Sequence, residues 1–132
     1  MVLSPSGEFR IIRTTDGGRS WDAPVRLDDA SSLGHVDVEM LDDGSAVATW
    51  VEFAEGRGRL RMRRVERSGA KSPAIEVSGS GPGRVSGYPR LARSGNDLLF
   101  TWAENTGASD SSEVAQQVRG AIARLPGVTG TR

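Results

Sequence analysis

The chain has 132 residues, a length that allows one domain, and its 17 basic and 17 acidic residues give a net charge of zero. A neutral chain has no global field that would attract nucleic acid or an anionic membrane. It has no cysteine, which excludes disulfides and thiolate chemistry, and its single histidine, His35, leaves little for a metal site. We therefore expect no cofactor, no metal, no nucleic-acid partner and no membrane insertion.

The first predicted unit, residues 1–27, is an incomplete one. Phe9–Arg13 forms an apolar and basic run, and Pro24–Leu27 forms a second short strand after a glycine-rich segment. A proline at the start of a strand suits a sheet edge, because its missing N–H removes no ladder bond there. The 17 glycines and 6 prolines of the chain indicate many turns, which favours an all-β protein.

The second predicted unit, residues 34–78, is a complete meander of four strands. Its first and third strands alternate polar and apolar residues, as strands with two unlike faces do. Asp43-Gly44 between the first two strands predicts a hairpin with a type I′ turn, which needs positive φ at both central residues. The four predicted strands are His35–Met40, Ala46–Phe53, Arg59–Arg63 and Pro73–Val77.

The meander is then repeated. Residues 89–104 align with residues 38–52, and the alignment places Trp102 at the position of Trp50. A repeat of roughly 40–50 residues built from sheet strands is typical of a β-propeller, with one blade per period. We interpret the two tryptophans as packing anchors between blades, because buried aromatic rings carry much of the packing of a core.

The third predicted unit, residues 86–125, ends in a segment with two interpretations. Residues 110–113 resemble a helix capping box, and the apolar residues after them follow a helical spacing. The repeat instead aligns Ala121–Leu125 with Arg61–Val65. We predict a strand over about residues 118–125, because the preceding strands need a partner.

One motif connects the chain to a family. Residues 14–21 fit the pattern Ser/Thr-x-Asp-x-Gly-x-Ser/Thr-Trp at every defined position, through Thr14, Asp16, Gly18, Ser20 and Trp21. The motif resembles the Asp-box, or BNR repeat, of the sialidase (neuraminidase) superfamily. In such a turn the carboxylate accepts hydrogen bonds from backbone N–H groups, and the glycine permits a positive φ. We expect the serine to bond locally and the tryptophan to bury its ring under the turn.

The resemblance implies a fold, a location and a limit on chemistry. Family propellers have six blades, so the chain would be a partial β-propeller of about two and a half four-stranded antiparallel blades, from the C-terminal part of an extracellular or periplasmic protein. The chain itself carries no signal peptide. In the family the box lies on the rim away from the ligand, which assigns Asp16 a structural role. The family's Arg-Ile-Pro motif is missing here, so the catalytic residues remain unknown and we expect no sialidase activity from this chain alone.

Candidate ligand residues lie on the predicted innermost strands, which line the central funnel of a propeller. His35 and Asp37 alternate on one strand, and Tyr88 and Arg90 alternate on the next. Arg90 could hold a carboxylate through two hydrogen bonds, and Tyr88 could pack on a sugar ring. The alternatives are an ion pair between Glu39 and Arg90 across the two blades, and a strand-end hydrogen bond at His35.

Charged residues elsewhere favour architectural roles. A stripe of arginines along one predicted strand could bind a polyanion, but a solvated outer strand with glutamate partners is the preferred interpretation. Two glutamates end equivalent second strands of the complete second unit and the incomplete third unit, and a residue repeated in each blade favours architecture over catalysis. The arginines are Arg57, Arg59, Arg61 and Arg63, and the glutamates are Glu52 and Glu104, with Glu66 as a further partner.

Two functional hypotheses follow. In the first, the chain belongs to a sialidase-like exo-glycosidase or to a catalytically silent relative that binds glycans. In the second, it belongs to a propeller that serves as a protein-interaction or structural module. An incomplete propeller exposes blade edges and an apolar face near Ile11, Ile12 and Val25, which predicts contact with upstream blades of the same protein or self-association.

Overall fold

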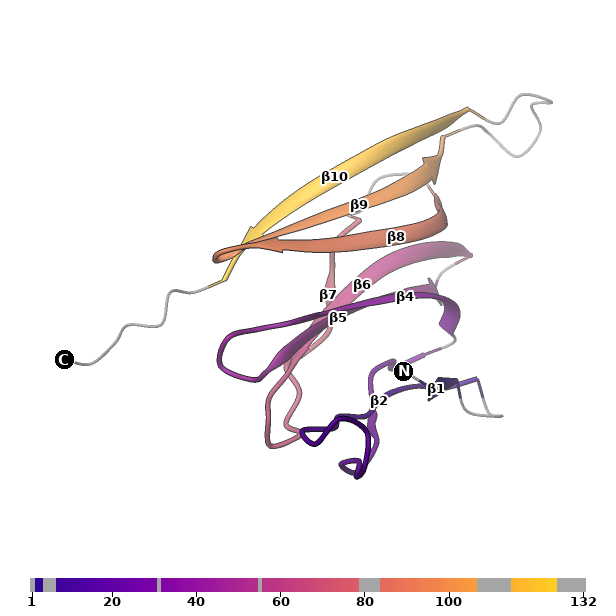
Figure 1. Cartoon of the computed structure of the whole chain (residues 1–132). Helices are drawn as coiled ribbons and strands as arrows, with labels where there is room; N and C mark the ends of the chain where they lie inside the picture. Colours follow the sequence, from indigo (N-terminus) through magenta and orange to yellow (C-terminus); the bar gives the residue numbers. More distant parts are fainter. Residues whose placement is uncertain are drawn as a thin grey trace.

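The fold consists of three antiparallel sheets that follow one another along the chain and lie stacked in the same order (Figure 1). A computed structural model describes residues 2–3, 7–30, 32–54, 56–78, 84–106 and 115–125. All regular elements in these ranges are strands, which confirms the prediction of an all-β chain. The described part of the chain contains no helix of the length and apolar character that a membrane crossing requires.

Each sheet is built from strands that are neighbours in sequence. The N-terminal sheet contains β1 (Val2–Leu3), β2 (Phe9–Ile11) and β3 (Val25–Arg26). The central sheet contains β4 (Ser32–Met40), β5 (Ala46–Ala54), β6 (Arg57–Val65) and β7 (Ile75–Glu76). The C-terminal sheet contains β8 (Arg84–Ser94), β9 (Asp97–Asn105) and β10 (Gln116–Arg124). The two-residue strand β1 was not predicted.

The β4–β5 hairpin forms at the predicted place, but the predicted turn type is wrong. Gly44 has a φ of 80°, whereas Asp43 keeps a negative φ. The Leu41 N–H donates to the Ser45 carbonyl at 2.8 Å, and the Gly44 N–H donates to the Leu41 carbonyl at 3.0 Å. This geometry matches a three-residue loop that ends in a left-handed glycine, which satisfies the same strand twist with one positive φ.

The C-terminal strand is confirmed, with a correction of its register. β10 pairs with β9 over Gln116–Arg124, so the repeat outweighs the helical spacing. Arg119 lies opposite Trp102, as Arg61 lies opposite Trp50, so the alignment of Ala121 with Arg61 was two residues out. A shift of two residues keeps each side chain on its predicted face, because side chains alternate along a strand. The capping-box residues 110–113 lie outside the described residues.

The two tryptophans occupy matching positions on β5 and β9, as predicted, and each packs against the preceding sheet. Trp50 is fully buried and Trp102 is 5% exposed. They belong to two separate cores, because each sheet interface has its own layer of apolar side chains. Trp50 packs with Phe9, Leu27, Ala48 and Val65, and Trp102 packs with Val47, Val51, Leu60, Leu98 and Phe100.

The uncovered apolar face lies on the C-terminal sheet and not where the sequence placed it. Ile11 and Val25 pack against the core that contains Trp50, which corrects the prediction of an open face there. Leu99, Val118 and Ile122 are 45%, 81% and 74% exposed on the outer side of β9 and β10. We call these three residues the outer face.

Candidate functional site

The Asp-box loop lies between β2 and β3 and is organised around one carboxylate, as predicted. Asp16 Oδ1 accepts hydrogen bonds from the N–H groups of Arg19 and Ser20, both at 2.9 Å, and from the Thr14 hydroxyl at 2.8 Å. Asp16 Oδ2 accepts from the Ser20 hydroxyl at 2.6 Å. These bonds, with that of the Ser20 hydroxyl the strongest, lower the pKa of Asp16 to about 2.

The glycine of the loop behaves as predicted, whereas the tryptophan does not. Gly18 has a φ of 89°, and its N–H donates to the Thr14 hydroxyl at 2.8 Å. Trp21 is 56% exposed, so the prediction of a buried ring is wrong. A Cβ added at Gly18 would lie 3.6 Å from Trp21 Cζ2, which places the indole against this glycine.

The strands β4 and β8 bring the predicted ligand residues together. The rings of His35 and Tyr88 meet edge to face, with 4.3 Å between their centroids and an angle of 90°. Asp37 Oδ2 accepts a hydrogen bond from the Leu91 N–H at 3.0 Å. The Asp37 carboxylate therefore links the central and C-terminal sheets, and this bond removes part of its capacity to contact a ligand.

His35 occupies an unusual backbone position. Its φ is 59°, next to Gly34 with a φ of 101°, and the ladder between β4 and β5 is irregular from Gly34 to Asp37. The Nδ1 atom of His35 is buried without a hydrogen-bond partner, so the predicted strand-end bond is not formed at this atom. The β8–β9 ladder has its own irregularity between Ser86 and Arg90. Such bulges redirect side chains and are common beside binding sites.

Tyr88 projects into solvent beside His35, and Arg90 lies two residues further along β8, opposite Thr101 of β9. Tyr88 is 77% exposed, and Arg90 is exposed as well. Among the described residues no ion pair joins Arg90 to Glu39, so the predicted inter-sheet pair is not formed. Two exposed groups with complementary chemistry, an aromatic ring and a guanidinium, therefore stand on one strand. We call His35, Tyr88 and Arg90 the β4–β8 patch.

The arginine stripe is not on a solvated outer strand, which corrects that prediction. β6 is an inner strand between β5 and β7, and the arginines of the stripe lie on the face of the sheet that carries Trp50. Arg59 pairs with Glu76 at 2.7 Å, and Arg63 is 2% exposed and lies 5.5 Å from the centre of the Trp50 ring. Arg63 also pairs with Asp29. These contacts leave no continuous basic surface for a polyanion along the stripe.

Glu52 has the architectural role that its repetition predicted. It is 4% exposed, and its Oε1 accepts from the N–H groups of Asp29 at 3.2 Å and Ala30 at 3.0 Å, and from Trp50 Nε1 at 3.4 Å. Its Oε2 lies 3.5 Å from Arg61 Nε, within ion-pair distance but without hydrogen-bond geometry. Glu52 thus ties the segment between the first two sheets to the central sheet.

Glu104 is the counterpart of Glu52 in the C-terminal sheet. It accepts from Arg119 Nε at 2.8 Å and from Gln117 Nε2 at 3.2 Å. Sequence reasoning missed Arg119, because the alignment placed Ala121 at the position that Arg119 occupies. The spacing gave no signal, since Arg119 follows Trp102 by 17 residues whereas Arg61 follows Trp50 by 11.

Neither a protein-family model, nor a curated protein, nor a solved structure matches this chain. Within the described ranges no three histidine or acidic side chains gather closely enough to hold a metal ion.

Proposed function

We propose that the chain is part of a sialidase-like BNR-repeat β-propeller and that it binds a glycan through the β4–β8 patch. The complete hydrogen-bond set around Asp16 supports the Asp-box assignment, because four donors converge on one carboxylate in the order the motif requires. The stacking of antiparallel sheets with Trp50 and Trp102 at equivalent positions supports successive blades.

The observation that carries the proposal is the exposed and supported ring of Tyr88. A tyrosine that is 77% exposed leaves most of its apolar area in water, and the edge of His35 holds the ring in place. The C–H face of a pyranose covers such a ring and removes this apolar area from water. A ring that is already oriented loses little conformational freedom on binding, which favours affinity.

The guanidinium of Arg90 favours a sugar that carries an acidic group. It lies two residues after Tyr88 on β8 and has no ion-pair partner among the described residues. A guanidinium binds a carboxylate through two parallel hydrogen bonds, which gives both affinity and orientation. A sugar acid with its ring on Tyr88 and its carboxylate on Arg90 satisfies both groups. In a whole protein of the sialidase type, catalytic groups would come from other blades, and its setting would be extracellular or periplasmic.

The test is a titration of the chain with N-acetylneuraminic acid, followed by NMR shifts of backbone amides. We expect shifts at β4 and β8, a loss of binding in Tyr88→Ala and Arg90→Ala, and retention of binding in Tyr88→Phe. Arg124→Ala, an exposed arginine on β10, is the matched control. Galactose, which lacks the carboxylate, should bind more weakly. Equal affinity of wild type and Tyr88→Ala would contradict the proposal.

A second candidate function is a structural or protein-interaction module, and the outer face favours it. Leu99 occupies on β9 the position that Val47 occupies on β5, and Val47 is covered by the C-terminal sheet. The outer face is therefore equivalent to the face of the central sheet that the C-terminal sheet covers. Concentration-dependent association of the chain, with no sugar binding, would favour this function over the first.

A further inference from the structure

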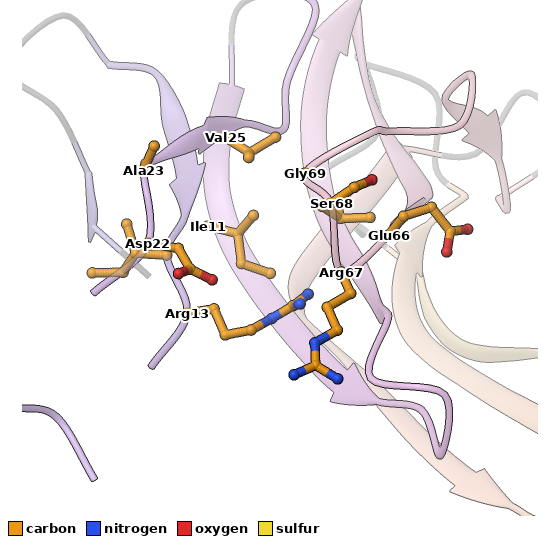
Figure 2. A pocket seen from close by; sticks show the side chains of 11 residues that line it. Ile11, Arg13, Asp22, Ala23, Val25, Glu66, Arg67, Ser68 and Gly69 are labelled. Atoms are coloured by element: carbon orange, nitrogen blue, oxygen red, sulfur yellow. The ribbon is translucent and has the colours of Figure 1, made fainter. Parts of the chain in front are cut away.

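A cavity of about 280 Å³ lies between the N-terminal and central sheets, beside the Asp-box loop (Figure 2). Its walls come from the end of β2, the segment before β3, and the turn between β6 and β7. This end of the central sheet is opposite to the β4–β8 patch, because β6 finishes where β4 finishes and His35 stands near the start of β4. The cavity and the β4–β8 patch are therefore separate sites.

The walls of the cavity are fixed by contacts between the two sheets. The Asp22 N–H donates to the Arg13 carbonyl at 2.8 Å, which closes the base of the Asp-box loop. On the other side, Gly69 has a φ of 89° and belongs to a tight turn of the central sheet. Lys71 Nζ donates to the Arg26 carbonyl at 3.1 Å and joins this turn region to β3. The cavity is thus bounded by the closed base of a loop on one side and by a tight turn on the other, and the Lys71 bond joins the two sheets beside it.

Two arginines line the cavity without an ion-pair partner among the described residues. The Nη1 atom of Arg13 is buried and makes no hydrogen bond, and Asp22 lies farther from it than the 4.0 Å of an ion pair. Arg67 is exposed at the rim, and its side chain and that of Arg13 extend toward the same part of the cavity (Figure 2). Glu66, the neighbouring acid, is held by Arg64 at 3.1 Å. An arginine that lines a partly enclosed cavity without an acidic partner keeps an uncompensated positive charge there, and an anion in the cavity neutralises that charge.

The remaining wall is apolar. Ile11, Val25 and Val65 line the cavity beside the two arginines. A cavity of roughly 150 Å³ with such a lining holds a benzene molecule. The larger volume here therefore accommodates one ring or a short chain together with a charged group.

We propose that this cavity binds a small anion that carries an apolar body, with its carboxylate or phosphate on Arg13 and Arg67 and its apolar part on Ile11, Val25 and Val65. The Asp-box loop then does more than close a turn, because its base positions Arg13. The proposal is independent of glycan binding at the β4–β8 patch, since the two sites share no residue.

The test uses benzoate and phenyl phosphate as probes, because each carries an aromatic ring and a negative charge. Benzyl alcohol, which lacks the charge, and inorganic phosphate, which lacks the ring, are the control ligands. Amide NMR shifts of the full chain report binding and locate it. We expect saturable shifts in residues 11–13, 22–25 and 65–69 with at least one of the two ring anions, and much weaker binding of benzyl alcohol and inorganic phosphate. The preferred probe distinguishes a carboxylate ligand from a phosphate ligand.

Variants test the roles of the two arginines. Arg67→Ala removes an exposed side chain, so the fold is retained, and Arg13→Lys keeps the charge but loses the forked geometry. We expect each to weaken binding of the preferred probe by about tenfold, the usual loss for a charged hydrogen bond. Arg19→Ala, an exposed arginine of the same loop that does not line the cavity, should bind as wild type does. Equal binding of benzyl alcohol, or unchanged affinity in both variants, overturns the proposal.

Discussion

Replacement of Glu52 by alanine should remove a large part of the stability of the fold. The carboxylate accepts three hydrogen bonds, and the donor from Trp50 is fully buried. A buried donor left without a partner costs about 1–3 kcal/mol, and each of the two partly buried backbone bonds contributes about 0.5–1.5 kcal/mol. We therefore expect Glu52→Ala to lower the free energy of unfolding by about 2–6 kcal/mol, out of the roughly 5–15 kcal/mol that a domain of this kind has.

The assay is urea denaturation followed by tryptophan fluorescence, with two comparison variants. Glu52→Gln keeps the oxygen that accepts all three bonds and loses the charge near Arg61, so it should cost about 1 kcal/mol. Glu66→Ala removes an exposed glutamate that pairs with Arg64 and should change stability by less than about 1 kcal/mol. If Glu52→Ala unfolded at the same urea concentration as Glu66→Ala, the assignment of Glu52 as the tie between the two sheets would be refuted.

Three further changes test other parts of the structure. Because hydrogen bonds lower the pKa of Asp16 from 3.8 to about 2, its stabilising effect is complete above pH 4 and disappears as the pH falls toward 2. Asp16→Asn should therefore be less stable than wild type at pH 7. The difference between the two thermal unfolding temperatures should shrink as the pH falls from 4 toward 2. Arg63→Met removes a buried guanidinium with two unbonded nitrogens. The free energy of unfolding of this variant, measured by urea denaturation, should lie within about 1 kcal/mol of the wild-type value or exceed it. Val118→Lys with Ile122→Lys should reduce self-association of the chain, measured by light scattering across a concentration series; a wild-type chain that is monomeric throughout would contradict this.

Local patterns predicted the strands and the hydrogen-bonded turn around Asp16 well, because both depend on residues close in sequence. Alternation located β4 and β6, and the repeat located β9 and β10. The hydrogen bonds of Asp16 follow from a motif of eight residues. The burial of Trp21 could not be predicted in the same way, since burial depends on what lies above the loop, and the indole is 56% exposed there.

The errors share one physical origin, which is the position of a strand within the stack of sheets. The stripe on β6 contains only polar and charged side chains at alternate positions, so it looks like a solvated edge. In the structure β7 covers one side of the strand, and Arg63 is accommodated over Trp50. Similarly, Ile11 looked uncovered because the sequence does not show that the N-terminal sheet packs its apolar side on the central one. The candidate residues on β4 and β8 were found because equivalent strands of neighbouring units lie side by side. The sequence did not show that the Asp37 carboxylate accepts a hydrogen bond from the Leu91 N–H.

The pairing of each strand with its neighbour in sequence has a consequence for how the chain folds. Closing a loop costs entropy that grows with its length, and the loops of the β4–β5 and β8–β9 hairpins are short. Hairpins such as β4–β5 and β8–β9 can therefore form before the sheets dock, in contrast to sandwiches, whose strands pair across long separations. The docking step is the formation of the layers around Trp50 and Trp102. Folding should then resemble that of a linear array of repeats, in which each unit gains stability from the one beside it.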